Sequence, residues 1–292
     1  MTEPIRKQVE MPGFTTPAIP PEILLRKGAR TTATVPDKVR KLLNLGVLET
    51  VNLVEWLIVD QKSLALRVAD SNGWSHLRQP LQHSLDSLPT KTAPRMMQAI
   101  GKTLALAFPG AKQLDQALAK LQNHCSDIVR SWCCYMIGTS EGLGLDQSMR
   151  RIYAFAADRN MSVRETAWLG LRGRISNQLE EALKLLVGFA TDADANVRRF
   201  ASEATRPRGV WCSHIEALKE NPAMGLQILN PLKSDSSKYV RDSVGNWLND
   251  ASKTQPEWVT KICRDWQKQS PTRETAYIIR RATRSLRKNQ SG

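Results

Sequence analysis

Two clusters of polar residues have the types and spacing needed to stabilise a positive charge. Glu203 follows Arg199 by one helical turn and precedes Arg206 by three residues, so two guanidiniums can contact one carboxylate. Asn246 and Asp250 are four residues apart and share one face of a helix. Carboxylates that are fixed in this way can stabilise a developing cation or orient a water molecule.

Each cluster also has a purely structural interpretation. The spacing around Glu203 is that of an ordinary ion pair on a helix surface, and spacing alone favours that interpretation. Asp250 lies near the end of its helix, where the helix dipole disfavours a carboxylate, so it requires a nearby cation. That cation can be Lys253 or a cationic substrate, and the sequence leaves both open.

The helices that carry these residues belong to a repeat. Arg130, Arg164, Arg198 and Arg241 each follow a valine, at steps of 34, 34 and 43 residues, and an aspartate precedes the last three by six residues. A period of this size with two helices in each repeat is typical of HEAT and armadillo proteins. In a stack of repeats, the arginine of one repeat can pair with the aspartate of a neighbouring repeat.

The longest step contains about nine added residues, and they fall at residues 202–211, with the sequence SEATRPRGVW. Pro207 must end the preceding helix, Gly209 permits an unusual turn, and Trp211 comes just before the next helix. Loops inserted into a rigid repeat frequently carry function. We therefore expect the interrupted repeat to hold the functional site.

Apolar residues recur at helical spacing throughout, and alternating strand patterns are absent. The sequence predicts an all-α fold, a HEAT-like α-solenoid in which antiparallel helix pairs form a right-handed superhelix with a basic concave surface. Residues 1–21 contain five prolines and are predicted to form a flexible arm. Residues 22–292 are predicted to form a single repeat domain, with the clearest repeats at 125–290.

The charge of the chain points to a polyanionic partner. The 292 residues carry a formal net charge of +14, with +5 in residues 1–150 and +9 in residues 151–292. Residues 273–288 contain six cations and one acid. Such a surface favours nucleic acid or an anionic membrane, and a solvated helix face is the alternative.

Other classes of protein lack support in the sequence. No run of about 18 apolar residues and no secretory signal occurs, so we expect no membrane association and a cytoplasmic location. The five cysteines form no Cys-x-x-Cys pair and the four histidines are scattered, so neither a metal site nor a disulfide framework is expected. No cofactor signature is present. We expect reduced, mostly buried thiols.

Two segments resemble a known family. VRRFASEATRPRGVW at 197–211 and YVRDSVGNWLND at 239–250, with the distance between them, are similar to the AlkC branch of the AlkC/AlkD-like DNA alkylation repair glycosylases. The resemblance covers about residues 125–270. It implies HEAT-like repeats and hydrolysis of the N-glycosidic bond of cationic alkylated bases, such as 3-methyladenine, in double-stranded DNA. It also implies a bacterial nucleoid-associated location.

The resemblance also implies roles for individual residues. The family's active-site carboxylate falls on Glu203, its aromatic residue on Trp211 and a second acid on Asp250. A further family acid falls near Trp168, which with Asn246 is a candidate to line the site. The chain also departs from the family at Ala204 and at residues 209–210.

Seven arginines are candidate ligands for DNA phosphates. The stronger candidates are those beside the repeated ladder, Arg199, Arg206 and Arg208. Repetition itself suggests a scaffold role for Arg164 and Arg241. The full set is Arg164, Arg172, Arg198, Arg199, Arg206, Arg208 and Arg241.

Two alternatives to a glycosylase stay open. The absence of the family acid at Trp168 motivates a non-catalytic HEAT-repeat protein that binds DNA. The solenoid alone motivates a helical scaffold for protein interactions. For each of these functions we expect a monomer.

Overall fold

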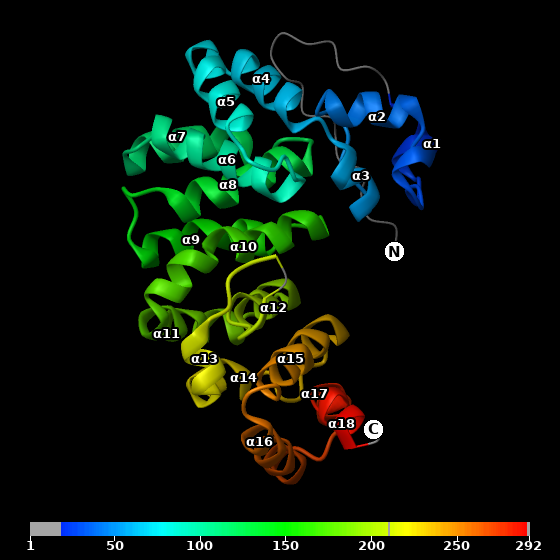
Figure 1. Cartoon of the computed structure of the whole chain (residues 1–292), viewed down its shortest axis with the longest axis vertical. Helices are drawn as coiled ribbons and strands as arrows, with labels where there is room; N and C mark the ends of the chain where they lie inside the picture. The colour runs from blue at the N-terminus through cyan, green and yellow to red at the C-terminus, as the bar shows by residue number, and fades with distance from the viewer. Residues whose placement is uncertain (1–18, 210, 291–292) are drawn as a thin grey trace. The chain divides into compact units, whose positions relative to one another are not determined.

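The computed structural model describes residues 19–209 and 211–290, and these residues form helices and no strand (Figure 1). The all-α prediction is confirmed. The first eighteen residues of the predicted arm lie outside the described residues, and the first helix begins at Pro21. The helices divide into two compact units, Met1–Leu143 with Arg159–Thr166, and Gly144–Asp158 with Ala167–Gly292. That residues 22–292 act as a single domain stays a prediction.

The first unit contains eight α-helices and two short 3-10 helices among its described residues, and the start of α10. They are α1 (Pro21–Leu24), η1 (Thr32–Thr34), α2 (Asp37–Asn44), α3 (Leu53–Ile58), α4 (Gln61–Ser71), η2 (Ser75–Leu77), α5 (Arg78–Asp86), α6 (Ala93–Ala107), α7 (Ala111–Leu121) and α8 (Asp127–Thr139). Helix α6 packs against α8.

The second unit contains the remaining helices, and α10 runs from the first unit into it. They are α9 (Leu145–Ala156), α10 (Met161–Asn177), α11 (Leu179–Ala190), α12 (Ala195–Ala204), α13 (Glu216–Glu220), η3 (Pro222–Gly225), α14 (Leu226–Leu229), α15 (Lys238–Ala251), α16 (Pro256–Gln269), α17 (Arg273–Ala282) and α18 (Arg284–Gln290).

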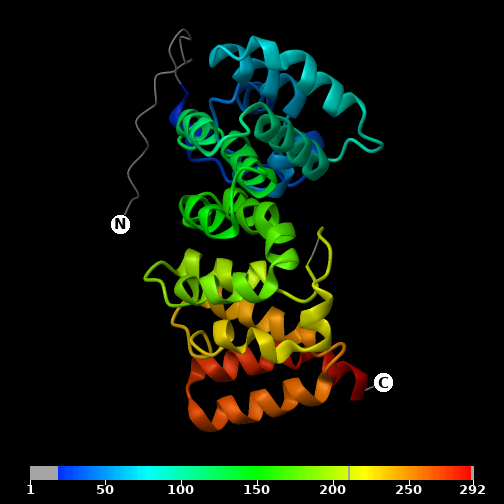
Figure 2. The same ribbon diagram turned by 90° about the vertical axis from the view of Figure 1, so that its left-hand side faces the viewer.

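Within the second unit the helices stack in successive layers (Figure 2). Helix α12 packs against α11 and α15, and α15 packs against α17. The contacts bury one stripe of each helix, and Val197, Val244 and Leu248 are completely inaccessible to solvent. Trp247 is also fully buried. The stack thus fixes the polar faces of α12 and α15 beside each other.

The repeated arginines occupy the same position, the fourth residue, in α8, α10, α12 and α15. Each donates hydrogen bonds to carbonyl oxygens in the turn before its own helix. Arg198 contacts the oxygens of Asp192 and Ala193 at 2.9 and 2.8 Å, and Arg241 contacts the oxygens five and six residues earlier at 2.7 and 2.8 Å. Arg198 also forms an ion pair with Asp235 of the next repeat at 2.7 Å. The predicted ladder between neighbouring repeats is confirmed for this pair.

The interrupted repeat has a distinct local structure. Helix α12 ends at Ala204, after ten residues, whereas α10 continues for seventeen. Pro207 follows and, as expected, no helix resumes until α13 begins at Glu216. The added residues therefore form an irregular loop beside the end of α12.

Candidate active site

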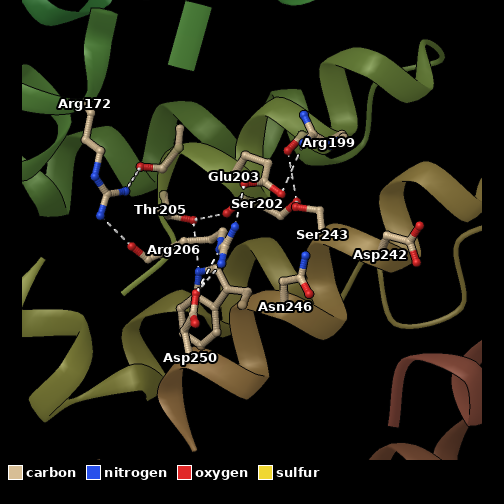
Figure 3. Close-up of polar contacts among 12 residues, drawn as sticks. Arg172, Arg199, Ser202, Glu203, Thr205, Arg206, Asp242, Ser243, Asn246 and Asp250 are labelled. Carbon is tan, nitrogen blue, oxygen red and sulfur yellow. Dashed lines mark hydrogen bonds and ion pairs between the residues drawn. The ribbon is translucent and has the colours of Figure 1, made fainter. Parts of the chain in front are cut away.

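Two buried carboxylates meet at one arginine between α12 and α15 (Figure 3). Glu203 and Asp250 are each 3% exposed, and both contact Arg206 from the loop. Arg206 donates from Nε and Nη2 to Oδ2 of Asp250, at 2.9 and 2.7 Å. Its Nη1 donates to Oε2 of Glu203 over a longer 3.3 Å. The structure thus brings together two carboxylates that are 47 residues apart in the sequence.

Each of the two carboxylates also has a second cation nearby. Arg199 approaches Oε1 of Glu203 at 3.4 Å and stacks on the ring of Tyr239, with 4.1 Å between the guanidinium carbon and the ring centroid. Lys253 approaches Oδ1 of Asp250 at 3.4 Å. The cation required near the C-terminal end of α15 is thus chiefly Arg206, with Lys253 as the weaker partner.

The charge state of Arg206 reflects this environment. Burial by itself lowers the pKa of a guanidinium, because it disfavours the charged form. The negative charges of Glu203 and Asp250, with their hydrogen bonds, outweigh that effect, and the pKa of Arg206 is raised. Arg206 therefore stays protonated and fixes both carboxylates.

Arg172 of α10 holds the loop that carries Arg206. Its guanidinium donates to the backbone oxygens of Ala204, Arg206 and Ser213, at 3.0, 2.7 and 3.0 Å. Arg172 is 3% exposed, and burial lowers its pKa. The same loop requires glycine at position 209, because a Cβ atom there would lie 2.1 Å from the sulfur of Cys212.

Trp211 projects from the same loop. Its side chain is 65% exposed, and its φ of +64° is the one left-handed value of a non-glycine residue among the residues that the structure describes. This conformation costs a tryptophan roughly 1–2 kcal/mol. A strained backbone that presents a large aromatic ring to solvent is typical of functional positions.

Hydrogen bonds between α12 and α15 keep the two carboxylates in register. The hydroxyl oxygens of Ser202 and Ser243 are 2.6 Å apart, and both side chains are buried. Nε1 of Trp247 donates to Oγ1 of Thr205 at 3.3 Å.

Most of the predicted phosphate ligands are engaged within the fold. Arg172, Arg198 and Arg206 contact internal carbonyl oxygens or carboxylates. Arg164 and Arg241 donate to carbonyl oxygens of their own turns, and Arg199 contacts Glu203. All of the seven except the buried Arg172 keep part of their surface exposed.

The two candidates for lining the site differ in environment. Trp168 of α10 is 5% exposed, whereas Asn246 is partly exposed one turn before Asp250. Oδ1 of Asn246 accepts hydrogen bonds from Arg281 and Arg284. Sequence reasoning placed these two arginines in a general basic stripe, and only the packing of α15 against α17 connects them to the site.

Three further findings on the described residues concern metal ligands, cysteines and membrane-spanning helices. No group of three or more His, Cys, Asp or Glu side chains able to hold a metal ion occurs among them. The five cysteines are free, and Cys133, Cys134 and Cys263 are buried, as predicted. None of the helices in the described part of the chain is long and apolar enough to cross a membrane.

These observations define an all-helical repeat protein with a buried carboxylate pair beside an irregular loop. Residues 111–286 match the family described as DNA alkylation repair enzyme, and the chain belongs to that family. The match covers both carboxylates, Arg206 and Trp211.

Individual relatives agree with this assignment. A 109-residue segment is 42% identical to the uncharacterized protein YhaZ of Bacillus subtilis (strain 168), covering 37% of this chain and 30% of YhaZ. The fold is similar to that of the alkylpurine DNA glycosylase AlkC of Pseudomonas fluorescens, solved bound to DNA containing an abasic site analog. The TM-score is 0.61 at 27% identity, over 78% of this chain and 61% of AlkC.

A more distant similarity supports the fold alone. AlkD2 of Streptococcus mutans has a TM-score of 0.54 at 20% identity, over 70% of this chain and 95% of AlkD2. The family match and the similarity to AlkC confirm the AlkC/AlkD-like family and the predicted HEAT-like architecture. The right-handed superhelix and the basic concave surface stay predictions. This chain spans less than two thirds of the length of YhaZ or of AlkC.

Proposed function

We propose that this protein is a DNA glycosylase that hydrolyses the N-glycosidic bond of cationic alkylated bases, of the 3-methyladenine type, in duplex DNA. The observation that carries the proposal is the pair of buried carboxylates, Glu203 and Asp250, which share the guanidinium of Arg206. Membership of the DNA alkylation repair family and the similarity to AlkC support it.

The chemistry matches the residues. A base that is alkylated on a ring nitrogen carries a positive charge, so its bond to the sugar is weak and the base is a good leaving group. When the C1′–N bond breaks, the electron pair moves to the base and neutralises it, and the sugar becomes an oxocarbenium-like cation. A preorganised carboxylate that faces this cation lowers the barrier electrostatically.

The contacts suggest a division of roles. Both hydrogen bonds from Arg206 to Asp250 end on Oδ2, whereas Oδ1 faces Lys253 at 3.4 Å. We assign Oδ1 to the sugar cation. Glu203 is held by two longer contacts, of 3.4 Å to Arg199 and 3.3 Å to Arg206. We assign Glu203 as the base that positions the water that attacks C1′ and accepts its proton.

Trp211 and three partly exposed arginines would bind the damaged DNA. A tryptophan ring against a cationic base contributes about 1–2 kcal/mol when the contact is desolvated. Arg199, Arg208 and Arg241 are proposed to contact phosphates.

Base release from methylated duplex DNA tests the proposal. Wild type, Asp250→Asn and Glu203→Gln are incubated with the duplex, and each free base is identified chromatographically while abasic sites are counted. We expect methylated bases from the wild type and a loss of at least about 100-fold in Asp250→Asn, with duplex binding retained. Normal release by both variants would contradict the assignment of the site.

One observation favours a second function. Trp168 is 5% exposed, and the resemblance places a further family acid near it, where this chain has no carboxylate at that residue. Tight, salt-sensitive binding of duplex DNA without release of any base by the wild type would establish a non-catalytic DNA-binding member of the family.

A further inference from the structure

Asn246 orients two arginines with a single neutral oxygen. Its Oδ1 accepts a hydrogen bond from Nε of Arg281 at 3.1 Å and from Nη1 of Arg284 at 2.8 Å. Asn246 lies on α15, and the arginines come from the end of α17 and the start of α18. Two guanidiniums from a different part of the chain therefore converge on one amide.

The glycine before Asn246 makes this arrangement possible. A Cβ atom on Gly245 would lie 2.8 to 3.0 Å from Cβ, Cγ and Cδ of Arg281, so the arginine side chain lies directly on the backbone of α15. Nε of Arg281 also donates to the backbone oxygen of Asp242 at 3.2 Å. Any larger residue at 245 would displace Arg281 from its anchor.

The anchor compensates only part of the positive charge of the two arginines. Arg198 and Arg206 are held by carboxylates, which neutralise them, whereas an amide oxygen orients a guanidinium without cancelling its charge. Arg281 has a carboxylate only at 3.5 Å, on Asp242, which Lys238 also contacts at 2.8 Å. Arg284 is exposed and forms no ion pair with the residues that the structure describes.

The exposed cation lies near the candidate active site. Asn246 is one helical turn from Asp250, and Figure 3 shows both residues on the same helix. Burial and the charge of Arg281 lower the pKa of Arg284, and Asp250 and Arg206 act on it with opposite signs. Arg284 therefore stands in a region of excess positive charge beside the carboxylates.

We propose that Asn246 presents Arg281 and Arg284 as a binding site for a DNA backbone phosphate, next to the nucleotide whose sugar lies at Glu203 and Asp250. This inference rests on the proposed function. Guanidiniums bind phosphate oxygens through several N–H groups at once, and a pair with a fixed orientation loses little side-chain entropy on binding. Asn246 is a positioning residue, and Arg284 is the principal phosphate ligand.

The test uses an isosteric charge change. Asn246→Asp preserves the acceptor oxygen and the shape, and it adds a carboxylate that neutralises the pair. The affinity of the full chain for one duplex is measured over a salt series for the wild type, Asn246→Asp and Arg284→Gln. The matched control is Gln267→Glu, the same amide-to-carboxylate change on the exposed face of α16.

We expect both test variants to bind about ten-fold more weakly near 0.1 M salt, with the slope of log K against log salt reduced by about 1. The control should change affinity less than about two-fold. Thermal unfolding establishes that Asn246→Asp folds, and the exposed Arg284 provides the second variant. Wild-type affinity and slope in both test variants would overturn the phosphate site.

Base release measured on the same samples separates this inference from the proposed function. Release by the wild type, with unchanged binding in both variants, would overturn the phosphate site alone. A reduced slope without release by the wild type would retain the phosphate site and overturn the glycosylase. Wild-type binding without salt dependence would overturn both.

Discussion

Arg206 places two N–H groups on one oxygen of Asp250, 44 residues further along the chain, at 2.9 and 2.7 Å. Asp250 is buried, so its carboxylate depends on this guanidinium for the interactions that water would otherwise supply. The same arginine reaches Glu203, and it therefore couples α12 and α15 electrostatically as well as through packing.

Removal of Arg206 should destabilise the protein strongly. Arg206→Met leaves two buried carboxylates without their shared partner, and we expect a loss of about 3–5 kcal/mol in the free energy of unfolding. The double variant Arg206→Met with Asp250→Asn should be less destabilised than the sum of the single variants. Urea denaturation of the four proteins measures the coupling, and additive effects would contradict the shared role.

Substitution of Trp211 should separate strain from function. Both Trp211→Gly and Trp211→Ala remove the ring, and we expect base release to fall about 10- to 30-fold. Glycine adopts a positive φ without strain, so the glycine variant should be more stable than the alanine variant by roughly 1 kcal/mol. Differential scanning calorimetry measures this difference, and equal melting temperatures would argue against a strained backbone.

Loss of Arg172 should loosen the loop that carries Arg206. Arg172→Met removes three hydrogen bonds to the oxygens of Ala204, Arg206 and Ser213. Each such bond to a charged group contributes about 1.5–3 kcal/mol. We expect faster proteolytic cleavage within residues 205–215 and reduced base release. The exposed Arg273→Met is the control, and an unchanged cleavage rate in Arg172→Met would refute the anchoring role.

His124 should make the protein less stable in acid. It is buried beside Arg130 and accepts a hydrogen bond at Nδ1 from the backbone of Ser126, and burial followed by the charge of Arg130 lowers its pKa to about 4. The unfolded chain binds this proton near pH 6.5, so stability falls as the pH drops below that value. Between pH 7 and 5 the expected loss from this group is about 2 kcal/mol.

The variant His124→Asn keeps an acceptor near Nδ1 and cannot titrate. Its free energy of unfolding should fall less than that of the wild type over the same pH range. Chemical denaturation at pH 5, 6 and 7 provides the comparison, and parallel pH dependence in the two proteins would rule out His124 as the source.

Local pattern was enough to predict the helical repeats and several members of the site. The Val-Arg spacing gave the register of α8, α10, α12 and α15, because each repeat places its arginine at the same helical position. The contact of Glu203 with Arg199 also follows from spacing, since four residues make one turn of α12. Arg206 lies beyond the end of α12, so its contact with Glu203 depends on the path of the loop.

Contacts between distant helices could not be predicted in the same way. The ion pair of Arg206 with Asp250 depends on how α12 packs against α15, and the convergence of Arg281 and Arg284 on Asn246 depends on the packing of α17. Arg172 looked like a phosphate ligand because its charge is visible in the sequence. Its three carbonyl partners become visible only when the loop is folded.

The arginine at the fourth position of α8, α10, α12 and α15 contacts the turn that precedes its helix. Each of these four turns is therefore held by a residue of its own repeat. A change in one turn therefore lowers the stability of its own repeat and of the interfaces with its neighbours, and the loss does not grow along the chain. Such a stack can accept an enlarged turn in one layer, as at residues 205–215, while the layers on either side retain their standard form. Each repeat can therefore change independently, and a chemical site can arise in one repeat while the other repeats keep their structure.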